Sequence, residues 1–273
     1  MKTLLSLLAL VPSLAFADNC RHEAARNLDI PLEGAKSVRV ELTSADVEVE
    51  GVKGMSGVEV RGRACASDEA RLAEMTLEQR REGDRIVVVA QVGKNGSGNG
   101  SWFGNTGFRV KLRMPAALAV AIQSSSGDAR VNGVASLDFD ASSGDLEMGE
   151  IPGGVSLSLS SGDVRGEGIG SLNVRKVSSG DITVRDIRGD AMVGSIGSGD
   201  VRLTDVRGGV TVERSGSGDI TLKDIGRDVK IGRVSSGDVD IDGVGGNLSF
   251  AARHDDDDIT YHHVAGKVTF ADD

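Results

Sequence analysis

Apolar residues recur two positions apart in short runs along the second half of the chain, and a polar turn follows each run. The runs are rich in Val, Ile and Leu, as in the pairs Val210/Val212 and Val229/Ile231. A period of two predicts β-strands with one buried face, and β-branched residues favour strands. The pattern therefore predicts many short strands separated by turns.

The turn carries the tripeptide Ser-Gly-Asp seven times, with its aspartates at spacings of 17, 18, 18, 19, 19 and 19 residues. In a degenerate eighth copy, Asp258 follows Asp238 by 20 residues. A fixed period of this size is the signature of a repeat architecture. Gly supplies backbone freedom at such a turn, and Ser and Asp can bond its amides. The seven aspartates are Asp128, Asp145, Asp163, Asp181, Asp200, Asp219 and Asp238.

The repeat also defines a core, because the first (+1) and sixth (+6) residues after each aspartate are apolar in every copy. The third residue (+3) is mostly Val, Leu or Ile, with Gly166 and Tyr261 as departures. One repeat cannot bury its apolar face, but stacked repeats can, if each strand pairs with its equivalent in the next coil. The sequence predicts an all-β fold, a parallel β-solenoid of 17–20-residue coils.

Before the repeats, residues 38–54 resemble a divergent first coil, with Asp46 in the ladder position and Val47, Val49 and Val52 at +1, +3 and +6. The repeat is then interrupted up to about Ala117. An open solenoid end exposes apolar core and strand edges, so we expect this interruption to form a cap. The expected domains are a β-rich cap over 18–122, which includes the divergent coil, and the repeat solenoid over 123–273.

Within the interruption, Ser67 to about Glu74 predicts one or two helical turns with Ser67 as the cap. Residues 75–81 and 85–91 predict a hairpin around Glu82-Gly83-Asp84. A single helix through Arg81 is the alternative. Residues 93–107 are rich in Gly, Asn and Ser and predict a loop, and alternating apolar residues from Phe108 to Met114 predict a strand.

Residues 1–17 have the features of a secretory signal: Lys2, an apolar run, and the ending Ala15-Phe16-Ala17. The run is too short to span a membrane as a mature helix, and no later stretch is apolar enough. We expect an exported protein, in the periplasm or at the cell surface. Outside the cytoplasm, the two cysteines, Cys20 and Cys65, favour a disulfide, with two reduced thiols as the alternative.

The repeat Ser-Ser-Gly-Asp-(Val/Ile), behind a signal peptide, resembles a bacterial family of uncharacterised β-strand-repeat proteins related to the auto-transporter adhesin head (GIN) domain. The contexts of Cys20 and of Ala64-Cys65-Ala66-Ser67, and Met114-Pro115 before the repeats, are similar to that family as well. The resemblance implies a right-handed β-helical envelope protein with an adhesive role, and it supplies no catalytic residues.

Charge is distributed unevenly, since residues 123–273 hold 26 Asp+Glu and 15 Lys+Arg, a balance of −11, whereas the first part balances at +1, giving −10 in total. Nucleic acid and anionic membrane surfaces are therefore disfavoured as partners. We expect an envelope protein or glycan as partner and no cofactor.

Three groups of residues are candidate sites. Stacked aspartates, Asp46 and Asp258 included, lie about 4.8 Å apart in such a fold, and they either satisfy turn donors or hold a row of cations such as calcium. A metal site and a solvated turn are both open for His254, Asp255–Asp258, His262 and His263. Trp102-Phe103 could bind a sugar or partner, or plug the solenoid end.

Enzymes on β-helices need a local, irregular cluster of carboxylates, or of a carboxylate and a base. The carboxylates of this chain repeat evenly, as structural residues do. The sequence thus favours a non-enzymatic envelope β-solenoid with an adhesin-like or scaffold surface. A glycan-active enzyme and a cation-binding solenoid are the alternatives.

Overall fold

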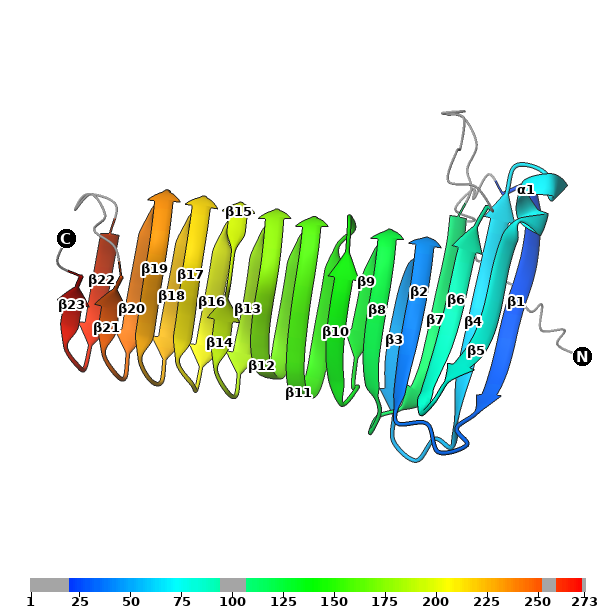
Figure 1. The fold of residues 1–273 in the computed structure, drawn as a ribbon, viewed down its shortest axis with the longest axis horizontal. Helices are drawn as coiled ribbons and strands as arrows, with labels where there is room; N and C mark the ends of the chain where they lie inside the picture. Colours follow the sequence, from blue (N-terminus) through cyan, green and yellow to red (C-terminus); the bar gives the residue numbers. More distant parts are fainter. Residues whose placement is uncertain (1–19, 94–106, 252–258, 272–273) are drawn as a thin grey trace, which may run out of the picture.

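The structure, a computed structural model, describes residues 20–93, 107–251 and 259–271. It is nearly all β, with 72% of residues in strands and 2% in helix, and it forms a parallel β-solenoid of about 8 turns. Figure 1 shows the coils stacked side by side along one long axis. The expected signal segment and Trp102-Phe103 lie outside the described residues.

Each coil consists of two strands that form opposite walls of a flattened tube. We call the strands that follow each Ser-Gly-Asp turn the leading wall and those that precede it the trailing wall. The leading wall contains β3 (Asp46–Val52), β7 (Gly107–Pro115), β9 (Ala129–Asn132), β13 (Ile182–Ile187), β16 (Val201–Val206), β18 (Ile220–Ile225), β20 (Val239–Val244) and β22 (Ile259–Val264).

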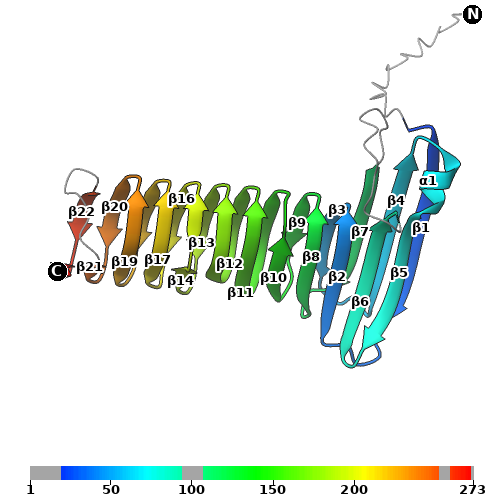
Figure 2. The ribbon, with the colours of Figure 1, turned by 45° about the horizontal axis from the view of Figure 1, so that its top comes forward.

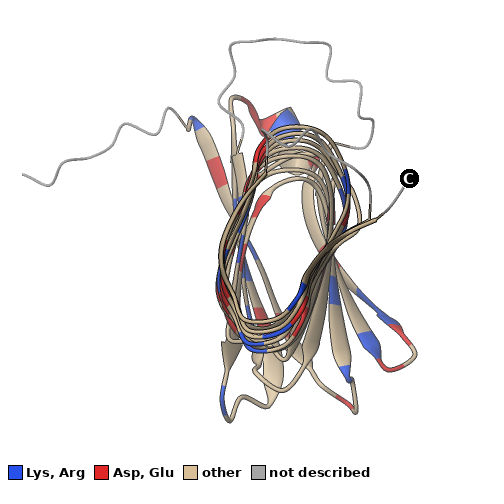
Figure 3. Cartoon of the chain, turned by 90° about the vertical axis from the view of Figure 1, so that its left-hand side faces the viewer, with Lys and Arg blue, Asp and Glu red and all other residues tan. Residues whose placement is uncertain are grey.

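The trailing wall contains β2 (Ser37–Ser44), β6 (Arg85–Val92), β8 (Ala119–Ser126), β10 (Ser136–Ala141), β14 (Ala191–Val193), β15 (Ile196–Ser198), β17 (Val210–Ser217), β19 (Val229–Ser236), β21 (Leu248–Phe250) and β23 (Val268–Phe270). Two long strands, β11 (Leu146–Ser161) and β12 (Val164–Ser179), pass round the corner and belong to both walls. Figure 3 shows the coils end-on as superimposed oval rings.

Equivalent positions of the repeat lie directly over one another. Ile182 pairs with Val201, and Val201 pairs with Ile220, in parallel register. These three side chains are at most 1% exposed, so the +1 row forms a continuous strip of core. The +3 and +6 rows are buried in the same way from Val131 and Val134 to Ile241 and Val244, except at Gly166. The predicted core is confirmed.

Two local insertions explain why the period drifts from 17 to 19 residues. The first lies in the corner after +6, where the next buried residue follows Val134 by three positions (Leu137) but Ile151 by four (Val155). The second lies in the trailing strand, where an extra residue between Leu172 and Val177 shifts the register against β11. The 17-residue coil has neither insertion, each 18-residue coil has one, and the 19-residue coils have both.

The second insertion has the character of a β-bulge, in which one wall holds one residue more than its neighbour. Its consequence is that two successive side chains point outward. In β12, Val174 and Val177 are buried, while Arg175 and Lys176 between them are both exposed. The same arrangement recurs at Glu213-Arg214 in β17, and Arg214 pairs with Arg233 of β19.

The divergent coil of residues 38–54 is confirmed, but it is not the outermost layer. β2 pairs with β8 on one side and with β6 on the other, and β3 lies likewise between β9 and β7. Strands β6 and β7, from later in the chain, thus form the layer outside it. The chain reaches this layer through β4 (Gly57–Ala66) and the hairpin formed by β5 (Met75–Glu82) with β6.

Antiparallel strands close the N-terminal end. β1 (His22–Pro31) pairs with β4, which pairs with β7, so the leading wall ends at β1, and the trailing wall ends at β5. Figures 1 and 2 show this cap beside the first coils. Arg26 of β1 bridges the two walls, since its guanidinium donates to the carbonyls of Met75 (3.0 Å) and Leu72 (3.2 Å).

The predicted hairpin is confirmed and the helix through Arg81 is wrong, but the cap of the short helix differs from our expectation. The helix α1 spans Glu69–Ala73, and its N-cap is Asp68 rather than Ser67. The Asp68 carboxylate accepts from the amide of Arg71 at 2.9 Å, and this bond lowers the pKa of Asp68. Ser67 instead donates its hydroxyl to Asp68 at 3.0 Å.

The C-terminal end has a different construction. In the described part of the chain, β22 pairs with β20 and β23 with β21, and no strand covers their outer edges. Tyr261 and Phe270 are 40% and 45% exposed, whereas the equivalent Ile241 and Phe250 one coil earlier are at most 2% exposed. The Phe250 and Phe270 rings stack with centroids 4.7 Å apart.

Candidate functional site

The Ser-Gly-Asp turns lie on one corner of the tube and form a ladder of hydrogen bonds between coils. The backbone amide of each ladder aspartate donates to Oδ1 of the aspartate one coil earlier. Asp128, for example, donates to Asp46 at 3.1 Å, and Asp200 donates to Asp181 at 2.9 Å. All seven steps from Asp46 to Asp238 have this bond, at 2.9–3.1 Å.

The ladder differs from the turn that we expected, because the donor belongs to the next coil and not to the same turn. The backbone adds a bond in the opposite direction, in which the amide after each aspartate donates to the next coil's aspartate carbonyl, as Val201 does to Asp219 at 2.8 Å. Each carboxylate is therefore part of the bonding that holds neighbouring coils in register. Asp258, the expected last member, lies outside the described residues.

Glycine is required in this corner because coils approach closely. Gly180 has φ of 124°, and a Cβ on it would lie 2.1 Å from the carbonyl oxygen of Gly162. No side chain fits at that distance, and the positive φ disfavours L-residues other than glycine. The Gly column keeps the turns close enough for each carboxylate to reach the next amide.

A second acidic row, which the sequence analysis missed, lies on the opposite corner. The fifth residue after each ladder aspartate has a left-handed backbone, with φ between 52° and 78°. Three members are glycine, and Asp tolerates this conformation better than most residues. The signal in the sequence is the residue directly before the apolar +6 position. The row consists of Gly133, Glu150, Gly168, Asp186, Asp205, Asp224, Gly243 and His263.

Shallow grooves follow this second corner. One has a volume of about 720 Å³, a floor that includes Val206, Ile225 and Val244, and a wall that includes Asp205 and Asp224. Another, of about 960 Å³, continues toward the cap past Lys53 and Arg188. Arg188 is occupied, since its guanidinium donates to the carbonyls of Gly168 and Ile151 at 3.1 and 3.3 Å. The corner thus uses its charged groups largely to satisfy backbone groups.

The leading wall carries charge in cross-strand pairs. Arg130 of β9 pairs with Glu147 of β11, and Lys111 of β7 pairs with Glu48 of β3 at 2.8 Å. These bonds raise the pKa values of Arg130 and Lys111. A hollow of about 330 Å³ lies among these pairs and the first ladder aspartates. Opposite charges on neighbouring strands stabilise a sheet modestly, so this surface is compensated.

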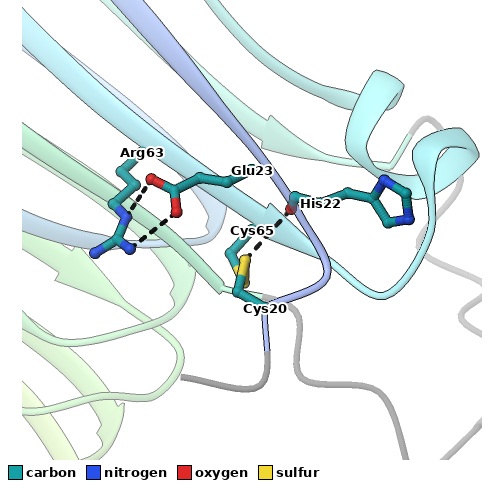
Figure 4. The surroundings of a disulfide bond; sticks show 5 residues. All are labelled: Cys20, His22, Glu23, Arg63 and Cys65. Atoms are coloured by element: carbon teal, nitrogen blue, oxygen red, sulfur yellow. Dashed lines mark hydrogen bonds and ion pairs between the residues drawn. A yellow bond between two sulfur atoms is a disulfide. The ribbon is translucent and has the colours of Figure 1, made fainter. Parts of the chain in front are cut away.

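Cys20 and Cys65 form a disulfide that ties the first described residue to β4 (Figure 4). The two Cα atoms lie 5.6 Å apart, across 45 residues of sequence. Beside it, Arg63 of β4 donates twice to the Glu23 carboxylate of β1, at 2.6 and 2.9 Å, and this lowers the pKa of Glu23. Both features join β1 to β4 at the cap.

The histidine group is only partly described, because His254 and Asp255–Asp258 lie outside the described residues. His262 and His263 belong to β22. His263 Nδ1 lies 2.7 Å from Asp242 Oδ1, and this hydrogen bond lowers the pKa of Asp242. In residues 20–93, 107–251 and 259–271, no three His, Cys, Asp or Glu side chains converge as metal ligands.

The helix α1 has five residues, and the described part of the chain contains no helix with the length and apolar character of a membrane span. The surface of the solenoid is therefore defined by its strands and corners.

Comparison with solved structures finds similar chains at low identity. A proposed cell adhesion protein from Clostridium sporogenes ATCC 15579 is 11% identical, with a TM-score of 0.41, over 74% of this chain and 99% of that one. A proposed adhesin from Bacteroides fragilis NCTC 9343 is 11% identical, with a TM-score of 0.39, over 91% and 97%. A proposed lipid binding protein from Parabacteroides distasonis ATCC 8503 is 15% identical, with a TM-score of 0.35, over 92% and 98%.

No curated protein matches the chain. A family model does, and it covers both the repeats and the later part of the cap. Since the family described as Toastrack DUF4097 matches residues 74–272, well over half of the sequence, the chain belongs to that family.

Proposed function

We propose that this protein is a non-enzymatic, exported β-solenoid of the cell envelope that acts through its surface, as an adhesin-like or scaffold protein. The observation that carries the proposal is the ladder. Its carboxylates accept backbone amides from one coil to the next, so the most regular polar feature of the chain serves the fold. What the repeats then offer to a partner is a long, regular outer surface.

Export is part of the proposal and is supported by the signal-like residues 1–17 and by the disulfide, which suits an oxidising compartment. A relation to the auto-transporter adhesin head (GIN) domain is also part of it, and is supported by the Ser-Ser-Gly-Asp repeat. The partner class we favour is an envelope glycan or an envelope protein.

The test combines binding with chemistry. The mature protein is incubated with the source cell's envelope fraction, and both capture and product formation are measured. We expect capture without release of reducing sugars or unsaturated products. Catalytic release of either product would overturn the proposal in favour of a glycan-active enzyme.

A further inference from the structure

The trailing wall carries a column of cations that the bulge creates. The second bulge residue is Lys176 in β12, Arg214 in β17 and Arg233 in β19, with Ser195 between the first two. Arg214 and Arg233 are paired neighbours on adjacent parallel strands, which places their Cα atoms about 4.8 Å apart. Lys230 of β19 is also exposed on this wall. We call Lys176, Arg214, Lys230 and Arg233 the cationic patch.

These four cations have no carboxylate within 4.0 Å among the described residues, which distinguishes them from the paired cations of the leading wall. Arg175, at the first bulge position, is occupied, since it donates to Asp138 and to Ser156, both at 2.8 Å. Like charges on adjacent strands repel each other and destabilise a sheet. The patch is therefore a surface with unsatisfied positive charge.

Charge is segregated around the tube. The repeat part of the chain balances at −11, yet the trailing-wall residues 171–179, 191–198, 210–217 and 229–236 hold five cations and one acid, Glu213. The acids lie mainly on the two corners, in the ladder and in the left-handed row. An anionic partner is thus attracted to the wall and repelled from both corners, which restricts it to a path along the solenoid axis.

The chemistry around the patch favours a polysaccharide over a protein or a membrane. Its neighbours are small and polar, such as Asn173, Thr211 and Ser235, and Met192 is its one large exposed apolar residue among those described, at 42%. Protein interfaces rely on buried aromatic anchors, and membrane surfaces on inserted apolar side chains. Hydroxyl and amide groups suit sugar hydroxyls, and paired guanidinium groups suit carboxylates.

We propose that the trailing wall between β12 and β19 binds an acidic polysaccharide, with Arg214 and Arg233 as the residues that hold its anionic groups. This inference rests on the proposed binding role and names its surface and the class of its partner. Two arginines one strand spacing apart can each take a carboxylate bidentately, and the flat wall lets the polymer lie across several coils.

The experiment measures binding of the mature protein to polygalacturonate, with neutral pullulan as the uncharged probe. We expect the wild type to bind polygalacturonate and not pullulan, with affinity that falls as salt rises. The double variant Arg214→Ser/Arg233→Ser should lose about tenfold or more in affinity, because charged hydrogen bonds are lost.

The matched control is Arg202→Ser/Lys223→Ser, which removes the same charge from exposed positions on the leading wall. It should leave the affinity within about twofold of the wild type, since long-range charge alone changes by the same amount in both variants. An equal loss in both variants would show that binding depends on net charge and would overturn the assignment. So would tighter binding to anionic phospholipid vesicles or to single-stranded DNA.

Failure of this inference is distinguishable from failure of the proposed function. If the envelope fraction captures the wild type and Arg214→Ser/Arg233→Ser equally, the binding role stands and the patch does not. If nothing in the envelope fraction is captured, the binding role itself fails. Unchanged melting temperatures of both variants confirm that their folds are intact.

Discussion

Each ladder aspartate works as an acceptor whose donor lies in another coil. The residues of the turn were predictable because they repeat, and so was a structural use of the carboxylate. The direction of the bond was not predictable, since a turn's own amides and those of the next coil are indistinguishable in sequence. The structure shows that Asp181 accepts from Asp200 at 2.9 Å.

Replacing both Asp181 and Asp200 with Asn should be tolerated, because Asn keeps the acceptor oxygen and removes repulsion along the row. Replacing both with Ala removes two acceptors and should cost about 1 kcal/mol at each position. Thermal melting in calcium and in chelator compares the variants. A calcium-dependent rise in the melting temperature of the wild type, abolished in the Asn variant, would instead show a cation ladder.

Ser215 is an exception within the core. It is 2% exposed, its hydroxyl has no hydrogen-bond partner, and it lies between Ile196 and Val234 in the stack. Ser215→Val should raise stability by about 1 kcal/mol or more, because a buried unsatisfied hydroxyl costs that much. Denaturant unfolding measures the change, with Ser235→Val on the surface as the control. A loss of stability in Ser215→Val would mean that the hydroxyl is satisfied.

At the level of elements, the strands were predictable from their period of two, but their order in space was not. The sequence places residues 38–54 before the interruption, which suggests the outermost coil. The structure instead inserts β2 and β3 between β6–β7 and β8–β9. Pairing of distant strands depends on long-range contacts that a local pattern does not encode, and the drift of the period likewise gained a physical cause only from the register.

The cap is the element that depends on the disulfide. Cys20→Ser/Cys65→Ser should destabilise the cap by up to about 4 kcal/mol, the chain-entropy value for a closed loop of this length. Melting of this variant should match that of the wild type in reductant. Peptide mapping without reductant should find Cys20 and Cys65 linked in protein recovered from the periplasm, and two free thiols there would contradict the prediction.

Over the whole molecule, every coil contacts only its neighbours, so stability is distributed along one axis. The two ends differ, since antiparallel strands close the first coils while Tyr261 and Phe270 of the last coil are exposed. A central coil is therefore bounded by core on both sides, and the last described coil on one side. The same substitution should have different consequences at these two places.

Val201→Asp places a charge at a position that is 1% exposed between Ile182 and Ile220, and we expect a loss of several kcal/mol. Ile259→Asp makes the same change at the equivalent, half-buried position of the last coil, where the carboxylate can reach water, so its loss should be much smaller. Hydrogen exchange should show lost protection spreading from β16 into neighbouring coils in Val201→Asp, while the cap retains its protection. Equal losses in both variants, or a Val201→Asp melting temperature within about one degree of the wild type, would contradict a core built coil upon coil.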